Sequence, residues 1–300
     1  MKKPIRGILM VSFVALIVGI GLVIAGVVAG ATWQDAGNAF FSGKYSIGKS
    51  TFIGIGANWK SQAVGDKLSG EDNVLKEVDA KKVERLTIRI FAGELDIKEG
   101  KSDYFQVNNK ENRGNCFVEY SDNELTITFE GNKHGKGAKA TLWIPEGLSI
   151  DEVEVRVDAG KITVDTLEAT NLMASVGAGQ LITKDIQATT VDIEVDAGEF
   201  KSGGEMIADK VALRVAAGAI KVNLIDTKDA DLNVAAGSIS ATFAGQESDY
   251  RIDANCDIGR IKIGGESYHV GKDYKSWGEA SGRVIVVECS VGEAEINFKR

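Results

Sequence analysis

The feature that most constrains this chain of 300 residues is a short pattern, Ala-Gly-x-hydrophobic, which returns every 19 or 20 residues. DAGKITV at 158–164, DAGEFKS at 196–202 and AAGAIKV at 216–222 are three of its copies. The glycines of all copies, with an early one and two looser ones at the end, are Gly93, Gly160, Gly179, Gly198, Gly218, Gly237, Gly259 and Gly292. A fixed period of this length is typical of a chain wound into coils that stack on one another.

Apolar columns accompany these glycines. In each copy the residues five, three and one before the glycine and two after it are apolar, for example Val155, Val157, Ala159 and Ile162 around Gly160. We expect them to face the interior, with the glycine at a corner because it adopts positive φ without a steric cost. The alanine before it would leave room inside the corner. The sequence therefore predicts an all-β fold, a single-stranded β-solenoid (β-helix-like) with coils of about 19–20 residues.

We expect the solenoid domain to cover residues 81–300 in four parts. These are N-terminal strands and a cap at 81–150, regular coils at 151–264, an insertion at 265–283 and a last coil at 284–300. The insertion contains Tyr268, Tyr274 and Trp277. These aromatic residues either cap the coil stack, which would otherwise expose unpaired strand groups, or form a patch for a partner.

The chain begins with a basic segment, residues 1–7, and continues with an apolar run at 8–31. As a helix the run would measure about 36 Å, enough to cross a hydrocarbon core of about 30 Å. The basic flank favours a cytoplasmic N-terminus and an extracytoplasmic solenoid. We therefore expect one N-terminal transmembrane helix that anchors the chain in the cell membrane. The alternative is a cleaved signal peptide, because Ala29-Gly30-Ala31 fits a cleavage site.

Two features near this helix suggest contacts. Gly26 and Gly30 form a GxxxG pattern, which either lets two helices associate, giving a homo-oligomer, or reflects the general abundance of glycine in membrane helices. The segment 32–80 is an aromatic juxtamembrane linker. Its aromatic residues, Trp33, Phe40, Phe41 and Trp59 among them, predict either an interface segment at the membrane or a partner, or a stalk packed on the domain.

The charge balance restricts the possible partners. The chain has 35 basic and 43 acidic residues, and the part after the apolar run carries a formal charge of −11. An acidic domain is a poor binder of nucleic acid, which requires a basic face. We expect the membrane, through the N-terminal helix, and an unknown envelope protein or surface polymer as partners.

Two of the three cysteines occupy equivalent positions. Cys256 and Cys289 both stand three residues before a corner glycine, in a column otherwise filled by Val or Ile. They are either two small buried apolar residues or a disulfide, because stacked coils would bring their Cα atoms to about 4.8 Å. Cys116 has no evident partner, and we expect it to pack inside.

Catalytic motifs are absent from the sequence. His134 and His269 lie in glycine-rich stretches without metal-ligand spacing, and no nucleophile elbow or phosphate loop occurs. We expect no cofactor and no metal. Asp158 and Asp196 stand two residues before a corner glycine, two coils apart, at roughly 9–10 Å. They are either solvated corner residues or a carboxylate pair of a carbohydrate-active enzyme.

Three motifs together carry a family resemblance: LTIRIFAGELDI at 86–97, ATLWIPEGL at 140–148 and the V-x-A-G-x-I repeats. With the N-terminal anchor, they resemble the bacterial "putative adhesin" family of β-strand-repeat domains of unknown function over about residues 79–298. The resemblance implies an envelope protein, of the kind found in Gram-positive bacteria and in some cases linked to envelope stress. It supplies no catalytic residues.

The sequence thus favours a membrane-anchored, extracytoplasmic, non-catalytic interaction or adhesin-like module of the cell envelope, and we do not expect an enzyme. A role in envelope-stress regulation is compatible with it. The alternative is a carbohydrate-active enzyme that uses the aligned aspartates on the solenoid.

Overall fold

The computed structural model describes residues 44–47, 50–53, 65–68, 71–110, 114–131, 137–268, 275–277 and 282–299. The predicted anchor, with Gly26 and Gly30, and the aromatic residues Trp33, Phe40, Phe41 and Trp59 lie outside them. No helix within the described part is long and apolar enough to cross a membrane. The strands β1 (Lys44–Ile47) and β2 (Ser50–Ile53) form a sheet of their own, separate from the strands between residues 65 and 299.

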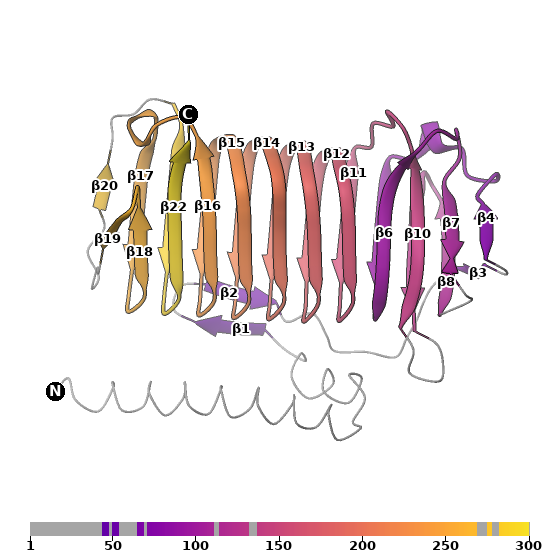
Figure 1. The fold of residues 1–300 in the computed structure, drawn as a ribbon, viewed down its shortest axis with the longest axis horizontal. Coiled ribbons are helices and arrows are strands. Elements are labelled where there is room, and N and C mark those ends of the chain that lie inside the picture. The colour runs from indigo at the N-terminus through magenta and orange to yellow at the C-terminus, as the bar shows by residue number, and fades with distance from the viewer. Residues whose placement is uncertain are drawn as a thin grey trace, which may run out of the picture. The chain divides into compact units, whose positions relative to one another are not determined.

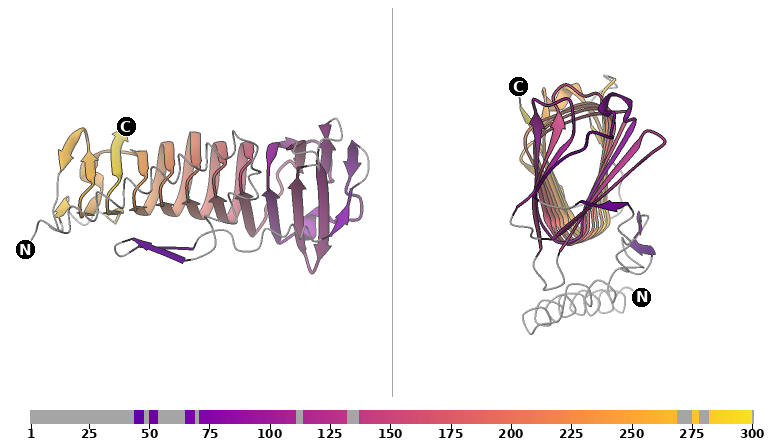
Figure 2. Two further views of the ribbon diagram at one scale, coloured as in Figure 1. Left: turned by 90° about the horizontal axis from the view of Figure 1, so that it is seen from below. Right: turned by 90° about the vertical axis from the view of Figure 1, so that its right-hand side faces the viewer.

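Four long strands form the regular coils of an all-β solenoid, as predicted (Figure 1). They are β12 (Lys161–Val176), β13 (Gln180–Val195), β14 (Glu199–Val215) and β15 (Ala219–Val234). Each pairs with the next in parallel, so Val176 lies opposite Val195. Pairing between β12 and β13 skips residues 165 and 170, which divides each coil into three straight segments. Seen along the stack, the coils superimpose around a common interior (Figure 2).

The interior consists of apolar columns that run along the stack. Ile162, Leu181, Phe200 and Ile220 stack in one column, and each is at most 1% exposed. One coil alone cannot cover its inward side chains, so each residue is buried by the coils above and below it. Burying a side chain of this size contributes about 1.5–3 kcal/mol before conformational entropy is counted. Each coil is therefore stable only together with its neighbours.

One predicted column is wrong. The alanine before the corner glycine faces outward, because Ala178, Ala197 and Ala217 are exposed. The residue before that alanine is buried instead, as Asp158 and Asp196 show. The strand alternation breaks two residues before the glycine, where the chain turns and places two consecutive residues inside.

Gly93 has the predicted positive φ, but the reason for glycine at the corners of the regular coils differs from the prediction. Gly179, Gly198 and Gly218 do not have positive φ. A Cβ at any of them would instead meet the carbonyl oxygen of the corner glycine in the neighbouring coil at less than the 3.0 Å that Cβ atoms essentially never cross. Close stacking of the coils, and not a left-handed backbone, requires glycine here.

At the N-terminal end the coils are out of sequence order. The coil of β5 (Arg85–Ile90) and β6 (Gly93–Gly100) lies between β11 (Glu152–Val157) with β12 on one side and β9 (Glu124–Glu130) with β10 (Ala138–Pro145) on the other. Antiparallel strands then cover the open edge: β7 (Gln106–Asn109), β8 (Asn115–Ser121), β3 (Asp66–Lys67) and β4 (Asp72–Val74).

The C-terminal end also departs from sequence order. The last coil, β21 (Val284–Cys289) and β22 (Glu293–Lys299), is inserted between the coil that ends in β16 (Ser238–Ala244) and the coil of β17 (Arg251–Cys256) and β18 (Arg260–Ile263). The strands β19 (Glu266–Tyr268) and β20 (Lys275–Trp277) pair antiparallel with β18 and β17. These two described strands of the predicted insertion therefore cover an open edge of the stack.

An aromatic cluster holds the inserted coil. The ring of Tyr250, which is fully buried, lies 5.7 Å from those of Phe243 and Phe298. Its hydroxyl donates a hydrogen bond of 2.7 Å to the carbonyl oxygen of Ala244. Arg283 stacks 5.0 Å from the same ring and pairs with the carboxylate of Asp226. Residues from β15, β16 and β22 thus meet at one point.

We predict that Gly218→Ala lowers the free energy of unfolding by about 1–3 kcal/mol, because the added methyl group forces two coils apart. Gly203→Ala is the matched control, because its Cβ would have no neighbour closer than 3.9 Å and its φ is not positive. This control should be neutral or stabilising, since alanine restricts the unfolded chain. Urea denaturation of both variants tests the prediction, and equal midpoints would contradict it.

Candidate functional site

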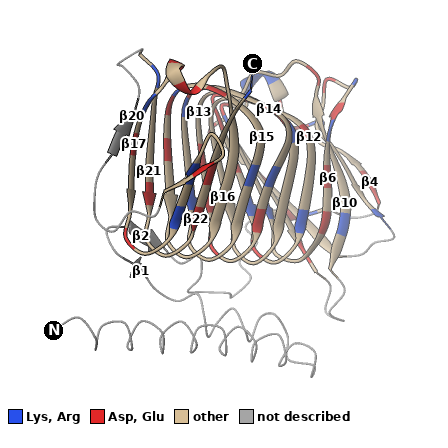
Figure 3. Cartoon of the chain, turned by 60° about the vertical axis from the view of Figure 1, so that its left-hand side comes forward, with Lys and Arg blue, Asp and Glu red and all other residues tan. Residues whose placement is uncertain are grey.

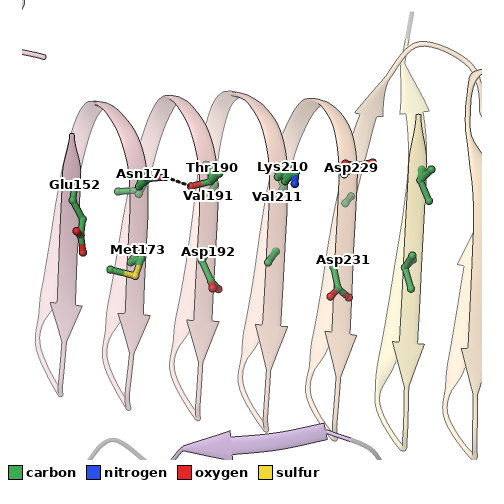
Figure 4. A pocket seen from close by; sticks show the side chains of 15 residues that line it. Glu152, Asn171, Met173, Thr190, Val191, Asp192, Lys210, Val211, Asp229 and Asp231 are labelled. Atoms are coloured by element: carbon green, nitrogen blue, oxygen red, sulfur yellow. Dashed lines mark hydrogen bonds between the residues drawn. The ribbon is translucent and has the colours of Figure 1, made fainter. Parts of the chain in front are cut away.

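The outer surface of the third segment of each coil forms a flat parallel sheet, which we call the flat face. Its side chains stand in columns because the strands are in register. The first column contains Glu152, Asn171, Thr190, Lys210, Asp229 and Val284. The second column contains Glu154, Met173, Asp192, Ala212, Asp231 and Val286. Figure 4 shows the two columns side by side across the strands.

A groove of about 660 Å³ runs along these two columns. Its apolar surface comes from Met173, Ala212, Val284 and Val286, and Met173 is 38% exposed. The small side chain of Ala212 leaves the space in the middle of the groove. An exposed apolar groove with a polar surround is typical of a binding surface.

Acidic groups dominate the polar surround of the groove. Glu152 pairs with Arg85 at 2.7 Å, and Asp192 pairs with Arg214. Asp229 and Asp231 are exposed, and no cation of the described chain lies within ion-pair distance of either carboxylate. Figure 3 shows how acidic and basic residues mix on the outer strands. Towards β15 the groove therefore carries negative charge that is open to a cationic partner group.

Asp158 and Asp196 do not form an open carboxylate pair. Both are buried, at 3% and 7% exposure, and the backbone of Gly177 lies in the coil between them. Asp158 accepts a hydrogen bond of 3.0 Å from Nε of Arg89, and its carboxylate forms an ion pair with Nη2 of the same residue at 2.9 Å. Burial raises the pKa of the Asp158 carboxyl above its ordinary value of 3.8, against the opposing effect of Arg89. The pair is part of the corner, and neither alternative, solvated residue or carbohydrate-cleaving acid, describes its position.

Cys256 and Cys289 lie directly opposite each other on β17 and β21, as the stacking prediction requires. Both are buried, and in this structure both are free thiols. Cys116 is buried in β8. Burial raises the pKa of Cys116 and of Cys289 to about 12.

The other predicted residues have mixed outcomes. His134, His269 and Tyr274 lie outside the described residues. Tyr268 packs on the core and donates a hydrogen bond of 3.0 Å to Glu266. Within the described ranges no three His, Cys, Asp or Glu side chains come together as a metal site.

Sequence reasoning missed Arg89 and the groove. Arg89 lies one residue before the apolar Ile90, and only the coil order pairs it with Asp158 on a neighbouring coil. The groove could have been found by comparing the outward positions of the third segments. Met173, Ala212 and Val286 interrupt a column that is otherwise charged.

A stack of parallel coils covered at both ends by antiparallel strands defines an all-β solenoid protein. The family model described as Toastrack DUF4097 matches residues 83–271, so the chain belongs to that family. No curated protein matches the chain.

The solved structures that match the chain are distant in sequence. A "putative cell adhesion protein" from Clostridium sporogenes is 15% identical, with 78% of this chain and 99% of that chain covered and a TM-score of 0.31. A "putative adhesin" from Bacteroides fragilis is 12% identical, with 77% and 97% covered and a TM-score of 0.39. A "putative lipid binding protein" from Parabacteroides distasonis is 13% identical, with 79% and 98% covered and a TM-score of 0.37.

We predict that Arg89→Ala costs about 2–4 kcal/mol of stability, because it leaves a buried carboxylate without its cation. Adding Asp158→Asn should recover much of this loss. Lys221→Ala is the control, since it removes the exposed partner of Glu199 and should cost less than about 1 kcal/mol. A double-mutant cycle measured in urea tests the coupling, and additive effects would contradict it.

The raised pKa of Asp158 gives a second prediction. The folded state holds the proton of this carboxyl more tightly than the unfolded state does, so stability should fall as pH rises above about 3.8. Asp158→Asn should remove this contribution. The free energy of unfolding of the variant minus that of the wild type should therefore increase as pH rises from 3 to 7. A difference that is constant or moves the other way would contradict the assignment.

Proposed function

We propose that this chain is a non-catalytic, adhesin-like interaction module of the cell envelope and that the flat face is its docking surface. The observation that carries the proposal is the groove, where Met173, Ala212 and Val286 form an apolar surface beside exposed acidic groups. Membership of a family of unknown function is compatible with this role and assigns no reaction.

The chemistry of the groove favours a protein partner over a polysaccharide. Apolar side chains in the centre of the face offer a hydrophobic contact, and the carboxylates of Asp229 and Asp231 suit lysine or arginine side chains at its rim. The regular spacing of the strands also keeps these groups at fixed distances. A rigid surface of this kind binds with little ordering cost.

In this proposal residues 8–31 anchor the chain in the cell membrane of a Gram-positive bacterium, with the N-terminus in the cytoplasm. Residues 1–7 are too few to signal alone, so a role in envelope-stress regulation would require a membrane partner. Gly26 and Gly30 or the aromatic segment at 32–80 would provide the contact. The acidic solenoid would be repelled by anionic headgroups, which favours its presentation away from the lipid.

The alternative function, a carbohydrate-active enzyme that uses Asp158 and Asp196, lacks support. Two carboxylates that flank a glycosidic bond have to reach the substrate. Here both are buried, and Arg89 holds one of them.

The docking surface can be tested by photo-crosslinking of the full chain in its membrane. A crosslinking amino acid at position 173 should capture a discrete protein partner, whereas the same amino acid at position 168 should not. Residue 168 is exposed on the same strand but belongs to the second segment, outside the flat face.

The double variant Asp229→Lys/Asp231→Lys should reduce capture from position 173 by at least about tenfold, because it places like charges opposite a cationic partner. Asp165→Lys/Glu168→Lys makes the same change of charge outside the flat face and should leave capture unchanged. Circular dichroism confirms that both variants fold. Equal capture from positions 173 and 168, or equal loss in both double variants, would overturn the proposal.

A further inference from the structure

The pair Cys256 and Cys289 occupies a special place in the coil order. Cys256 ends β17, in the outermost coil, and Cys289 ends β21, in the inserted last coil. The two residues are register partners in parallel strands. They extend the inward column of Val195, Val215 and Val234, where every other member is a hydrocarbon side chain.

The geometry of this pair suits a covalent bond. In-register residues on neighbouring strands lie about 4.8 Å apart at Cα, inside the range of 4.4–6.8 Å that disulfides span. The two side chains also affect each other's pKa, since Cys289 lowers that of Cys256 and Cys256 raises that of Cys289. The thiol of Cys289 also donates a hydrogen bond to the carbonyl oxygen of Gly292, with an Sγ–O distance of 3.2 Å.

No competing pairing exists. The chain has three cysteines, and the third, Cys116, is buried in β8 at the other end of the stack. The coils from β11 to β16 separate it from the pair.

We propose that Cys256 and Cys289 form a disulfide that fastens the inserted last coil to the outermost coil. The bridge would close a loop over residues 257–288, which contains β18, β19 and β20. It would therefore fix the C-terminal part of the stack, one of the two places where spatial order and sequence order differ. This inference does not depend on the proposed function.

The bond forms by exchange with an external disulfide, such as oxidised glutathione. One cysteine thiolate attacks the external disulfide, forms a mixed disulfide and releases one small thiolate. The second cysteine thiolate then attacks the protein sulfur of the mixed disulfide and releases the other. The protein pair loses two electrons and two protons, and the external disulfide becomes two thiols.

The timing of this exchange follows from burial. Cys256 is 0% and Cys289 3% exposed in the folded chain. Burial also raises the pKa of Cys289 to about 12, so little thiolate is present at neutral pH. The bridge has to form before the last coil is fully inserted, and oxidation of the folded, reduced protein has to await its opening.

The experiment refolds the full chain from the reduced state with reduced and oxidised glutathione, then alkylates it in denaturant without reductant. Mass spectrometry should find Cys116 alkylated and one peptide pair linked through Cys256 and Cys289. Three alkylated cysteines after refolding would overturn the proposal. This measurement tests for the disulfide in the wild type and does not depend on the folding of any variant.

Variants test the structural role of the bridge. The oxidised wild type should melt roughly 5–10 °C above the reduced form. Cys256→Val and Cys289→Val retain an apolar side chain in the column and should abolish this difference. Cys116→Val, a matched change at the other end, should retain it. A shift that survives in Cys256→Val would contradict the assignment.

The rate of oxidation is a separate test of the timing. Oxidation by glutathione should be at least about tenfold slower when it starts from the folded, reduced chain than during refolding, because the folded thiols are buried. Equal rates would show that the pair is accessible in the folded chain and would contradict the proposed order of events.

Discussion

The direct stacking of one corner glycine on the backbone carbonyl of the next is the contact on which the rest of the solenoid depends. It brings neighbouring coils close enough for every straight segment to form a parallel ladder. The same approach lets the inward side chains cover one another without gaps. Any residue larger than glycine at these corners separates the backbones and weakens both effects. The regular spacing of side chains in the interior columns and on the flat face depends on this contact.

At both ends of the stack the exposed strand edge is covered in the same way. A parallel solenoid ends in unpaired backbone groups, which invite pairing with other chains. At the N-terminal end β7 and β8 run antiparallel over the outermost coil, and at the C-terminal end β19 and β20 do so. At the N-terminal end the outermost coil is that of β9 and β10, although the coil of β5 and β6 comes first in the sequence. At the C-terminal end the outermost coil is that of β17 and β18, although the coil of β21 and β22 comes last. The chain therefore cannot add its coils strictly in the order in which they are synthesised.

Periodicity was sufficient to predict the solenoid, its coil length and the stacking of Cys256 on Cys289. It could not predict the orientation of the corner residues, because the break in alternation at Asp158 depends on the turn and not on the pattern. It could not reveal that Gly292 contacts Gly237 while Gly259 contacts Gly292, since all coils share the same columns and are interchangeable by sequence. Periodicity also could not predict the groove, because a repeat identifies positions that recur, whereas Met173 and Ala212 depart from the residue types of their column.

The combination of a uniform middle and two specialised ends has an evolutionary consequence. Gln180 is the register partner of Glu199, so residues 180–198 form one complete unit of the repeat. Duplication or loss of such a middle unit would retain both end structures and keep every column aligned. Such a change would alter the length of the stack by about 4.8 Å and would add or remove one strand of the flat face. Gene lengthening within the repeat therefore adjusts the reach and the binding area of the molecule together, without a new fold.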